Sequence, residues 1–143
     1  MKKKFVMFLM AVMMSFSAVC FASYGSDLDA ETKMVDQFFA GGDYKKIVNF
    51  LDPELTKELT AERYKTVFED MNNGLGKMIR KDLRVYQIFP DGHILRYEAK
   101  FEKKPEIEID VVFKNANGKL TFGDFRIIEP NTQAPADNNA AKK

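Results

Sequence analysis

Few residues of this 143-residue chain have the type and spacing that catalysis requires. The chain contains one histidine, His93, and one cysteine, Cys20. A histidine that acts as a general base or metal ligand needs partners that hold its ring. The sequence around His93 offers none, so we interpret it as a solvated turn residue. No glycine-rich phosphate loop and no Gly-x-Ser-x-Gly motif occurs. We therefore assign no catalytic residue and expect no cofactor.

Carboxylates are the other candidates for chemistry, and many of them alternate with basic residues. The acidic positions of one stretch are Glu98, Glu102, Glu106, Glu108 and Asp110. Arg96 and Lys100 interrupt that series. A calcium site needs several oxygens gathered by one loop, whereas carboxylates at strand spacing beside cations are typical of a solvated face. We therefore expect no metal site.

Four strands would position these side chains. Period-two alternation, broken by turn residues, predicts strands over residues 83–89, 93–102, 106–114 and 120–128. Asn117-Gly118 is the strongest hairpin signal in the chain. One face of the second and third strands is apolar except for a tyrosine. Its members are Leu95, Tyr97, Ala99, Phe101, Ile107, Ile109, Val111 and Phe113.

The loop between these two strands predicts their register. A three-residue loop over Lys103–Pro105 would place Tyr97 opposite Val111, so that inward apolar residues meet one another. The same register would place Glu98 opposite Asp110. Because directly opposed like charges are destabilising, we expect that face to be open to water.

The last strand needs one irregularity. Phe122 and Phe125 fall on opposite alternations, and a bulge near Gly123 would return both rings to one face. A carboxylate beside Tyr97 inside an apolar cavity would suit an enzyme. Asp124 could take that place only in a strand without the bulge.

Helices precede the strands. Their apolar residues recur at positions i, i+3, i+4 and i+7, which gives each helix one stripe to bury. Capping residues mark the helix starts and one short helical turn: Ser26, Asp43, Asp52 and Thr60. Gly41-Gly42 would end the first helix and Asn72-Asn73-Gly74 the third. The order predicts an α+β fold, with three N-terminal helices packed on a curved four-stranded antiparallel sheet.

The ends of the chain have their own compositions. Residues 1–22 combine a basic start, an apolar run and small residues, which is the pattern of a secretory signal peptide. Lipidation at Cys20 is the alternative, although Val19 departs from the lipoprotein pattern. Residues 130–143 are polar, which predicts a disordered tail. One domain would then occupy residues 23–129. We expect an exported protein without a membrane span after signal cleavage.

Charge excludes one class of partner. Removing Lys2–Lys4 with the signal peptide leaves 19 basic against 21 acidic residues, compared with 22 and 21 in the whole chain. The mature part is therefore slightly acidic and shows no concentrated basic stretch. We expect no nucleic-acid partner.

Three segments resemble the nuclear transport factor 2-like superfamily. These are the junction Phe38-Phe39-Ala40-Gly41-Gly42-Asp43-Tyr44, the turn over Phe50–Leu55 and the closing strand Gly123-Asp124-Phe125-Arg126-Ile127. The resemblance covers residues 27–129 and looks closest to small exported bacterial domains without an assigned activity. It implies a cone-shaped α+β fold with a cavity between sheet and helices, and frequent homodimers.

The resemblance implies a ligand pocket inside this cone. The candidate lining residues are Tyr64, Phe68, Tyr97, Phe101, Val111, Phe113 and Phe125. Because this lining is almost entirely apolar, we expect a non-enzymatic domain that binds an apolar small molecule or an envelope protein. A small isomerase-like or dehydratase-like enzyme that uses the cavity is the alternative, since the superfamily includes both classes.

Overall fold

The computed structural model describes residues 25–130. The predicted signal peptide, Cys20 and residues 131–143 of the predicted tail lie outside these residues. Within residues 25–130, no helix is long and apolar enough to cross a membrane. The chain divides into two compact units, one ending at Leu51 and the other beginning at Asp52.

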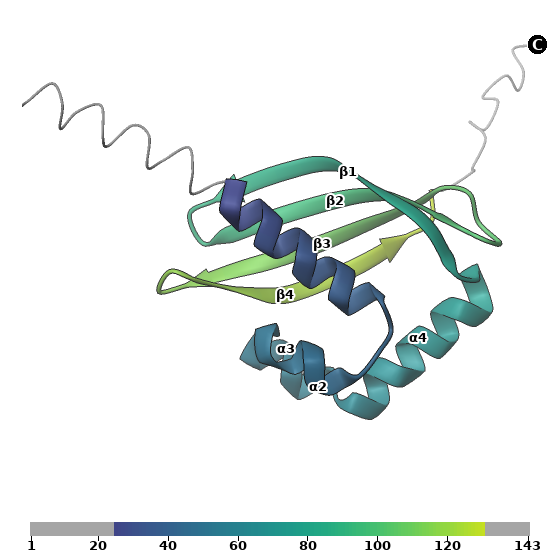
Figure 1. Ribbon diagram of the computed structural model, residues 1–143, viewed down its shortest axis with the longest axis horizontal. Helices are drawn as coiled ribbons and strands as arrows, with labels where there is room; N and C mark the ends of the chain where they lie inside the picture. The colour runs from purple at the N-terminus through teal and green to yellow at the C-terminus, as the bar shows by residue number, and fades with distance from the viewer. Residues whose placement is uncertain (1–24, 131–143) are drawn as a thin grey trace, which may run out of the picture. The chain divides into compact units, whose positions relative to one another are not determined.

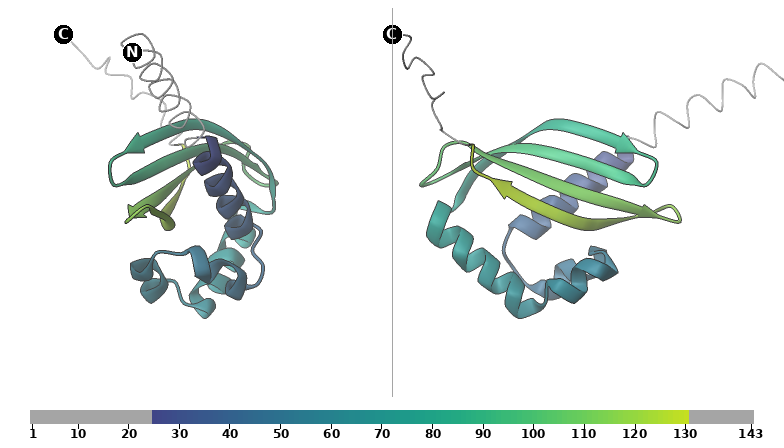
Figure 2. Two further views of the ribbon diagram at one scale, coloured as in Figure 1. Left: turned by 60° about the vertical axis from the view of Figure 1, so that its left-hand side comes forward. Right: turned by 180° about the vertical axis from the view of Figure 1, so that it is seen from behind.

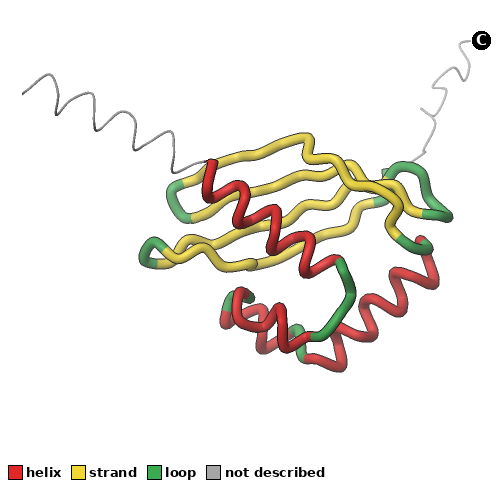
Figure 3. Tube along the Cα trace, viewed as in Figure 1, coloured by secondary structure: helices red, strands yellow, loops and turns green. Residues whose placement is uncertain are grey.

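The first unit is helical (Figure 3). A helix covers residues 25–39, followed by α2 (Tyr44–Ile47) and the 3-10 helix η1 (Val48–Phe50). Gly41 adopts a φ of 65° just beyond the first helix, as a terminating glycine does. Asp43 caps α2 by accepting the backbone N–H of Lys45, as predicted. Ser26 is not a cap, because residue 25 is already helical.

The second unit begins with two helices, α3 (Pro53–Glu58) and α4 (Ala61–Leu75). The predicted cap residues, Asp52 and Thr60, accept backbone N–H groups in their first turns. The helix does not end at Asn72–Gly74 as predicted. It continues to Leu75, because Gly76 takes the positive φ that closes the helix and donates its N–H to the carbonyl of Asn72.

Four antiparallel strands follow in the order β1-β2-β3-β4 (Figure 1). They are β1 (Met78–Phe89), β2 (Gly92–Phe101), β3 (Ile107–Ala116) and β4 (Lys119–Ile128). The predicted α+β class is therefore confirmed. The pairing of β1 with β2 shifts register at Ile79 and Arg84, and β1 bends along its length (Figure 2).

The predicted turn and bulge are both present. Asn117 and Gly118 adopt φ values of 55° and 78°, which is the conformation that a tight two-residue hairpin turn needs. The register between β3 and β4 shifts so that Gly123 is the additional residue. Beyond this bulge Asp124 lies opposite Val112 and is exposed. Asp124 therefore points away from the apolar face.

The predicted register between β2 and β3 is wrong by two residues. Tyr97 lies opposite Ile109 rather than Val111. The loop is longer than three residues, because it extends from the end of β2 at Phe101 to the start of β3 at Ile107. A shift of two keeps every side chain on its predicted face. It also places Arg96 opposite Asp110, with which it forms an ion pair, and Glu98 opposite Glu108 instead of Asp110.

The inward face of β2, β3 and β4 forms the core of the second unit. Its most deeply buried side chains are Leu95, Ile109, Val111, Phe113 and Phe122, each 0% exposed. Helix α3 contacts β4, and the Asp52 N–H donates to the carbonyl of Phe122 at 2.8 Å. The last residue of α4 contacts the loop between β2 and β3. There the N–H of Lys103 donates to the carbonyl of Leu75 at 2.9 Å.

Candidate functional site

A pocket lies where the β1–β2 turn meets the end of β3. We call it the hairpin pocket, and its volume is about 570 Å³. This volume falls within the roughly 300–1,000 Å³ typical of small-molecule sites. Its lining residues are Asp52, Phe89, Asp91, Gly92, His93, Ile94, Val112, Phe113, Lys114, Asn115 and Ala116.

The wall of the hairpin pocket is apolar and open to solvent. Phe89 is 45% exposed, Ile94 and Val112 are half-buried, and Ala116 is exposed. Alternation along β1, β2 and β3 puts Phe89, Ile94 and Val112 on the outward face of the sheet. Scattered exposed apolar residues are common, but a concave group of them marks a binding surface.

His93 contributes to this pocket from a position that contradicts our prediction. It lies in β2, not at the turn, and is only 5% exposed. Its Nδ1 lies 3.1 Å from the Tyr86 hydroxyl on β1, and the two rings meet edge to face. The sequence contained the signal, since His93 has the same alternation as the inward residues Leu95 and Tyr97. We missed it because we treated a residue next to a turn as solvated.

Gly92 fixes how closely β2 and β3 approach at the pocket. A Cβ added there would overlap the carbonyl oxygen of Phe113 on β3. Only glycine fits this approach without moving a strand. The Asp91 carbonyl also accepts the N–H of Asn115 at 2.9 Å, so the turn is tied to the end of β3.

A charged cluster borders the pocket. The Lys114 ammonium lies 2.7 Å from Oε2 of Glu54 and 3.2 Å from Oδ1 of Asp52. Asp52 is 8% exposed, and its other oxygen, Oδ2, lies 3.4 Å from the hydroxyl of Thr121. The sequence identifies Asp52 only as a helix cap. Its ion pair with Lys114 is not visible there, because Lys114 lies 62 residues away along the chain.

These contacts favour the charged forms of Asp52 and Lys114. Burial opposes the charge of Asp52, but the Glu54 N–H, the Lys114 ammonium and the Thr121 hydroxyl outweigh it and hold the pKa of Asp52 below its usual value. Hydrogen bonds to Glu54 and then to Asp52 raise the pKa of Lys114. The arrangement is therefore an ion-pair network that joins Lys114 to two carboxylates.

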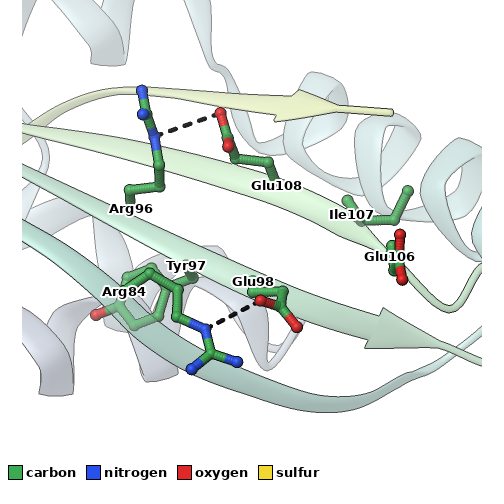
Figure 4. A pocket seen from close by; sticks show the side chains of 7 residues that line it. All are labelled: Arg84, Arg96, Tyr97, Glu98, Glu106, Ile107 and Glu108. Atoms are coloured by element: carbon green, nitrogen blue, oxygen red, sulfur yellow. Dashed lines mark hydrogen bonds and ion pairs between the residues drawn. The ribbon is translucent and has the colours of Figure 1, made fainter. Parts of the chain in front are cut away.

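A second hollow lies on the sheet and is lined largely by charge (Figure 4). We call it the charged groove, and its volume is about 350 Å³. Its lining residues are Arg84, Arg96, Tyr97, Glu98, Glu106, Ile107 and Glu108. Arg84 lies 3.0 Å from Glu98, and Arg96 lies 3.3 Å from Glu108. Arg96 also binds both oxygens of Asp110, at 2.8 and 3.1 Å. Both arginines of the groove are therefore paired with carboxylates.

The seven predicted pocket residues are mostly core. Tyr64, Phe68, Tyr97, Phe101, Val111 and Phe113 are at most 8% exposed, and Phe125 is half-buried. The rings of Tyr64 and Phe68 lie one turn apart on α4, with centroids 4.7 Å apart and planes inclined at 55°. Tyr97 lines the charged groove and Phe113 the hairpin pocket, and the Lys81 ammonium lies 5.0 Å from the centroid of the Tyr97 ring.

Comparisons with known proteins bear on the fold. No model of a protein family matches the chain, and no curated protein matches it. Among solved structures, the chain is similar to the crystal structure of a proposed NTF2-like transpeptidase from Campylobacter jejuni. The TM-score is 0.51 and the sequence identity 13%, and the match covers 68% of this chain and 96% of that one. The chain therefore has the α+β fold of the nuclear transport factor 2-like superfamily.

Proposed function

We propose that this chain is an exported, non-enzymatic domain that binds a small, largely apolar ligand in the hairpin pocket. The observation that carries the proposal is the apolar, solvent-open wall formed by Phe89, Ile94 and Val112 in a concavity of about 570 Å³. Solvation of such a wall is unfavourable, and a ligand that covers it would remove apolar surface from water on both sides.

Two titratable groups at the pocket, Asp52 and His93, are buried and already hydrogen-bonded within the protein. A general base needs a proton-accepting atom that can reach the substrate. Asp52 is committed to the N-terminus of α3, to Lys114 and to Thr121. His93 is buried against Tyr86. Each of these groups has a structural partner that a substrate would have to displace.

Catalysis is the alternative function, either as acyl transfer or as an isomerase-like reaction. The name of the Campylobacter protein suggests acyl transfer, which commonly uses a serine or cysteine nucleophile. Neither residue type occurs after Ser26 in this sequence. Asp124, the carboxylate that the sequence offered for an isomerase-like site beside Tyr97, lies on the opposite face of the sheet. Binding is therefore the better-supported function.

Export is part of the proposal and rests on the sequence of residues 1–22. Cleavage after Ala22 would leave a mature chain that begins at Ser23. Lipidation at Cys20 would instead give a mature chain that begins at Cys20, which is three residues longer and carries the mass of the attached lipid. The intact mass of the protein from its own host distinguishes these outcomes.

Native mass spectrometry of the protein purified from the organism that encodes it tests the function. We expect a stoichiometric small molecule on the wild type and its loss from Phe89→Gln, which removes an apolar wall residue without adding charge. Ile79→Gln is the matched control, because Ile79 is 60% exposed on the same strand and does not line the pocket. Both substitutions should change stability by no more than about 0.5 kcal/mol.

Two results would count against the proposal. Wild-type protein without any bound molecule would contradict a small-ligand function. A ligand that survives Phe89→Gln would lie elsewhere, and the seven predicted cavity residues would then be the next set to substitute.

A further inference from the structure

Charge around the hairpin pocket bears on the class of its ligand. The lining contains two carboxylates, Asp52 and Asp91, and one ammonium, Lys114. Glu54 adds a third carboxylate through its contact with Lys114. A smaller adjoining pocket of about 240 Å³ shares Lys114 and adds Glu58 and Asp124. Acidic groups therefore outnumber the single cation along this edge.

Lys114 is poorly placed to attract an anion. Its ammonium already contacts Glu54 at 2.7 Å and Asp52 at 3.2 Å. An anionic ligand would have to displace one of these carboxylates, and it would then face the remaining negative groups. Because the pocket wall is apolar, the local dielectric constant is lower than in water, and this repulsion would be screened less.

Asp91 is the carboxylate best placed to meet a ligand. It lies in the two-residue turn at the mouth of the pocket and is exposed. Within residues 25–130 it has no cationic partner. Phe89 stands two residues before it in the chain, so an apolar contact and a carboxylate occur side by side at one rim.

We propose that the hairpin pocket selects a cationic amphiphile, a small molecule with an apolar body and a protonated amine. The apolar body covers Phe89, Ile94 and Val112, and the amine lies beside Asp91. This inference rests on the proposed function, because it concerns the same pocket. The inference specifies a positive charge on the ligand, which the apolar wall alone does not determine.

Titration calorimetry of the full chain with three eight-carbon probes tests the inference at neutral pH. The probes are octylammonium, octanol and octanoate, which share one alkyl chain and differ in charge. We expect octylammonium to bind at least about tenfold more tightly than octanoate, with octanol between them. Asp91→Asn should weaken octylammonium binding by about three- to fivefold and leave octanol unchanged. Glu62→Gln on α4, outside the pocket, is the matched control and should change neither.

The outcomes separate the two proposals. Equal binding of all three probes, lost in Phe89→Gln, would overturn the charge preference and leave the apolar pocket as the binding site. Tighter binding of octanoate would overturn the preference directly. Octylammonium binding that is unaffected by Asp91→Asn would overturn the placement of the amine. Binding of none of the probes would overturn both the proposed site and the inference built on it.

Discussion

The hairpin pocket and the charged groove are two hollows on one sheet with opposite chemistry. In the groove, Arg84 and Arg96 have carboxylate partners within 3.3 Å. In the pocket, Phe89 is 45% exposed and contributes to an apolar wall. Ion pairs between exposed side chains are satisfied with or without a ligand, whereas exposed apolar surface gains from being covered. The hairpin pocket, which is the less charged of the two hollows, is therefore the better candidate for ligand binding.

The largest expected effect concerns the backbone beneath the pocket. Gly92→Ala places a methyl group against the carbonyl of Phe113 and should destabilise the fold by about 3 kcal/mol, because the strands must separate. Gly74→Ala is the control, since nothing lies within 4 Å of a Cβ at this helical position. It should be neutral or stabilising by up to about 1 kcal/mol. Urea unfolding measures both, and equal effects would contradict the close approach of β2 and β3.

Substitution of the two groove arginines should have smaller and unequal effects on stability. Arg96→Met leaves Asp110, which is 5% exposed, without its bidentate partner. The melting temperature should fall by several degrees, because a buried carboxylate without a partner is unfavourable. Arg84→Met removes only an exposed pair with Glu98 and should leave the melting temperature nearly unchanged. Thermal melts that rank the two variants in the reverse order would refute this assignment.

The smallest expected effect is a pH dependence at the pocket edge. The pKa of Asp52 is lowered, so its contribution to stability is present above the ordinary value of 3.8 and is lost as the pH falls through the folded-state pKa. The pKa of Lys114 is raised, so its contribution is present below 10.5 and is lost as the pH rises through its folded-state value. Asp52→Asn should flatten the acidic limb of a stability–pH curve. Asp43→Asn, at an exposed helix cap outside the pocket, is the matched control.

Local sequence signals predicted the fold well. Asn117-Gly118 specified a turn through its tolerance of positive φ, and the mismatch of Phe122 with Phe125 located the bulge at Gly123. The β2–β3 register was missed, because a shift of two residues preserves every face. The registers differ on the outer face, where Asp110 lies opposite Arg96 instead of Glu98.

The candidate site was harder to predict than the fold. The ion pair that borders it joins Asp52 to Lys114, which lie far apart in the chain, so no local spacing reveals it. His93 was predictable from the alternation of β2, yet its place beside a turn suggested solvent. The exposure of Phe89 depends on which strands end beside it, and that information lies in the tertiary structure.

Backbone NMR distinguishes a ligand bound in the hairpin pocket from one bound in the charged groove. Octylammonium is titrated into uniformly ¹⁵N-labelled full-length protein while its backbone amide resonances are followed. We expect the largest saturable shifts at Gly92, Ile94 and Val112. Largest shifts at Glu98 and Glu108, across the charged groove, would contradict this expectation.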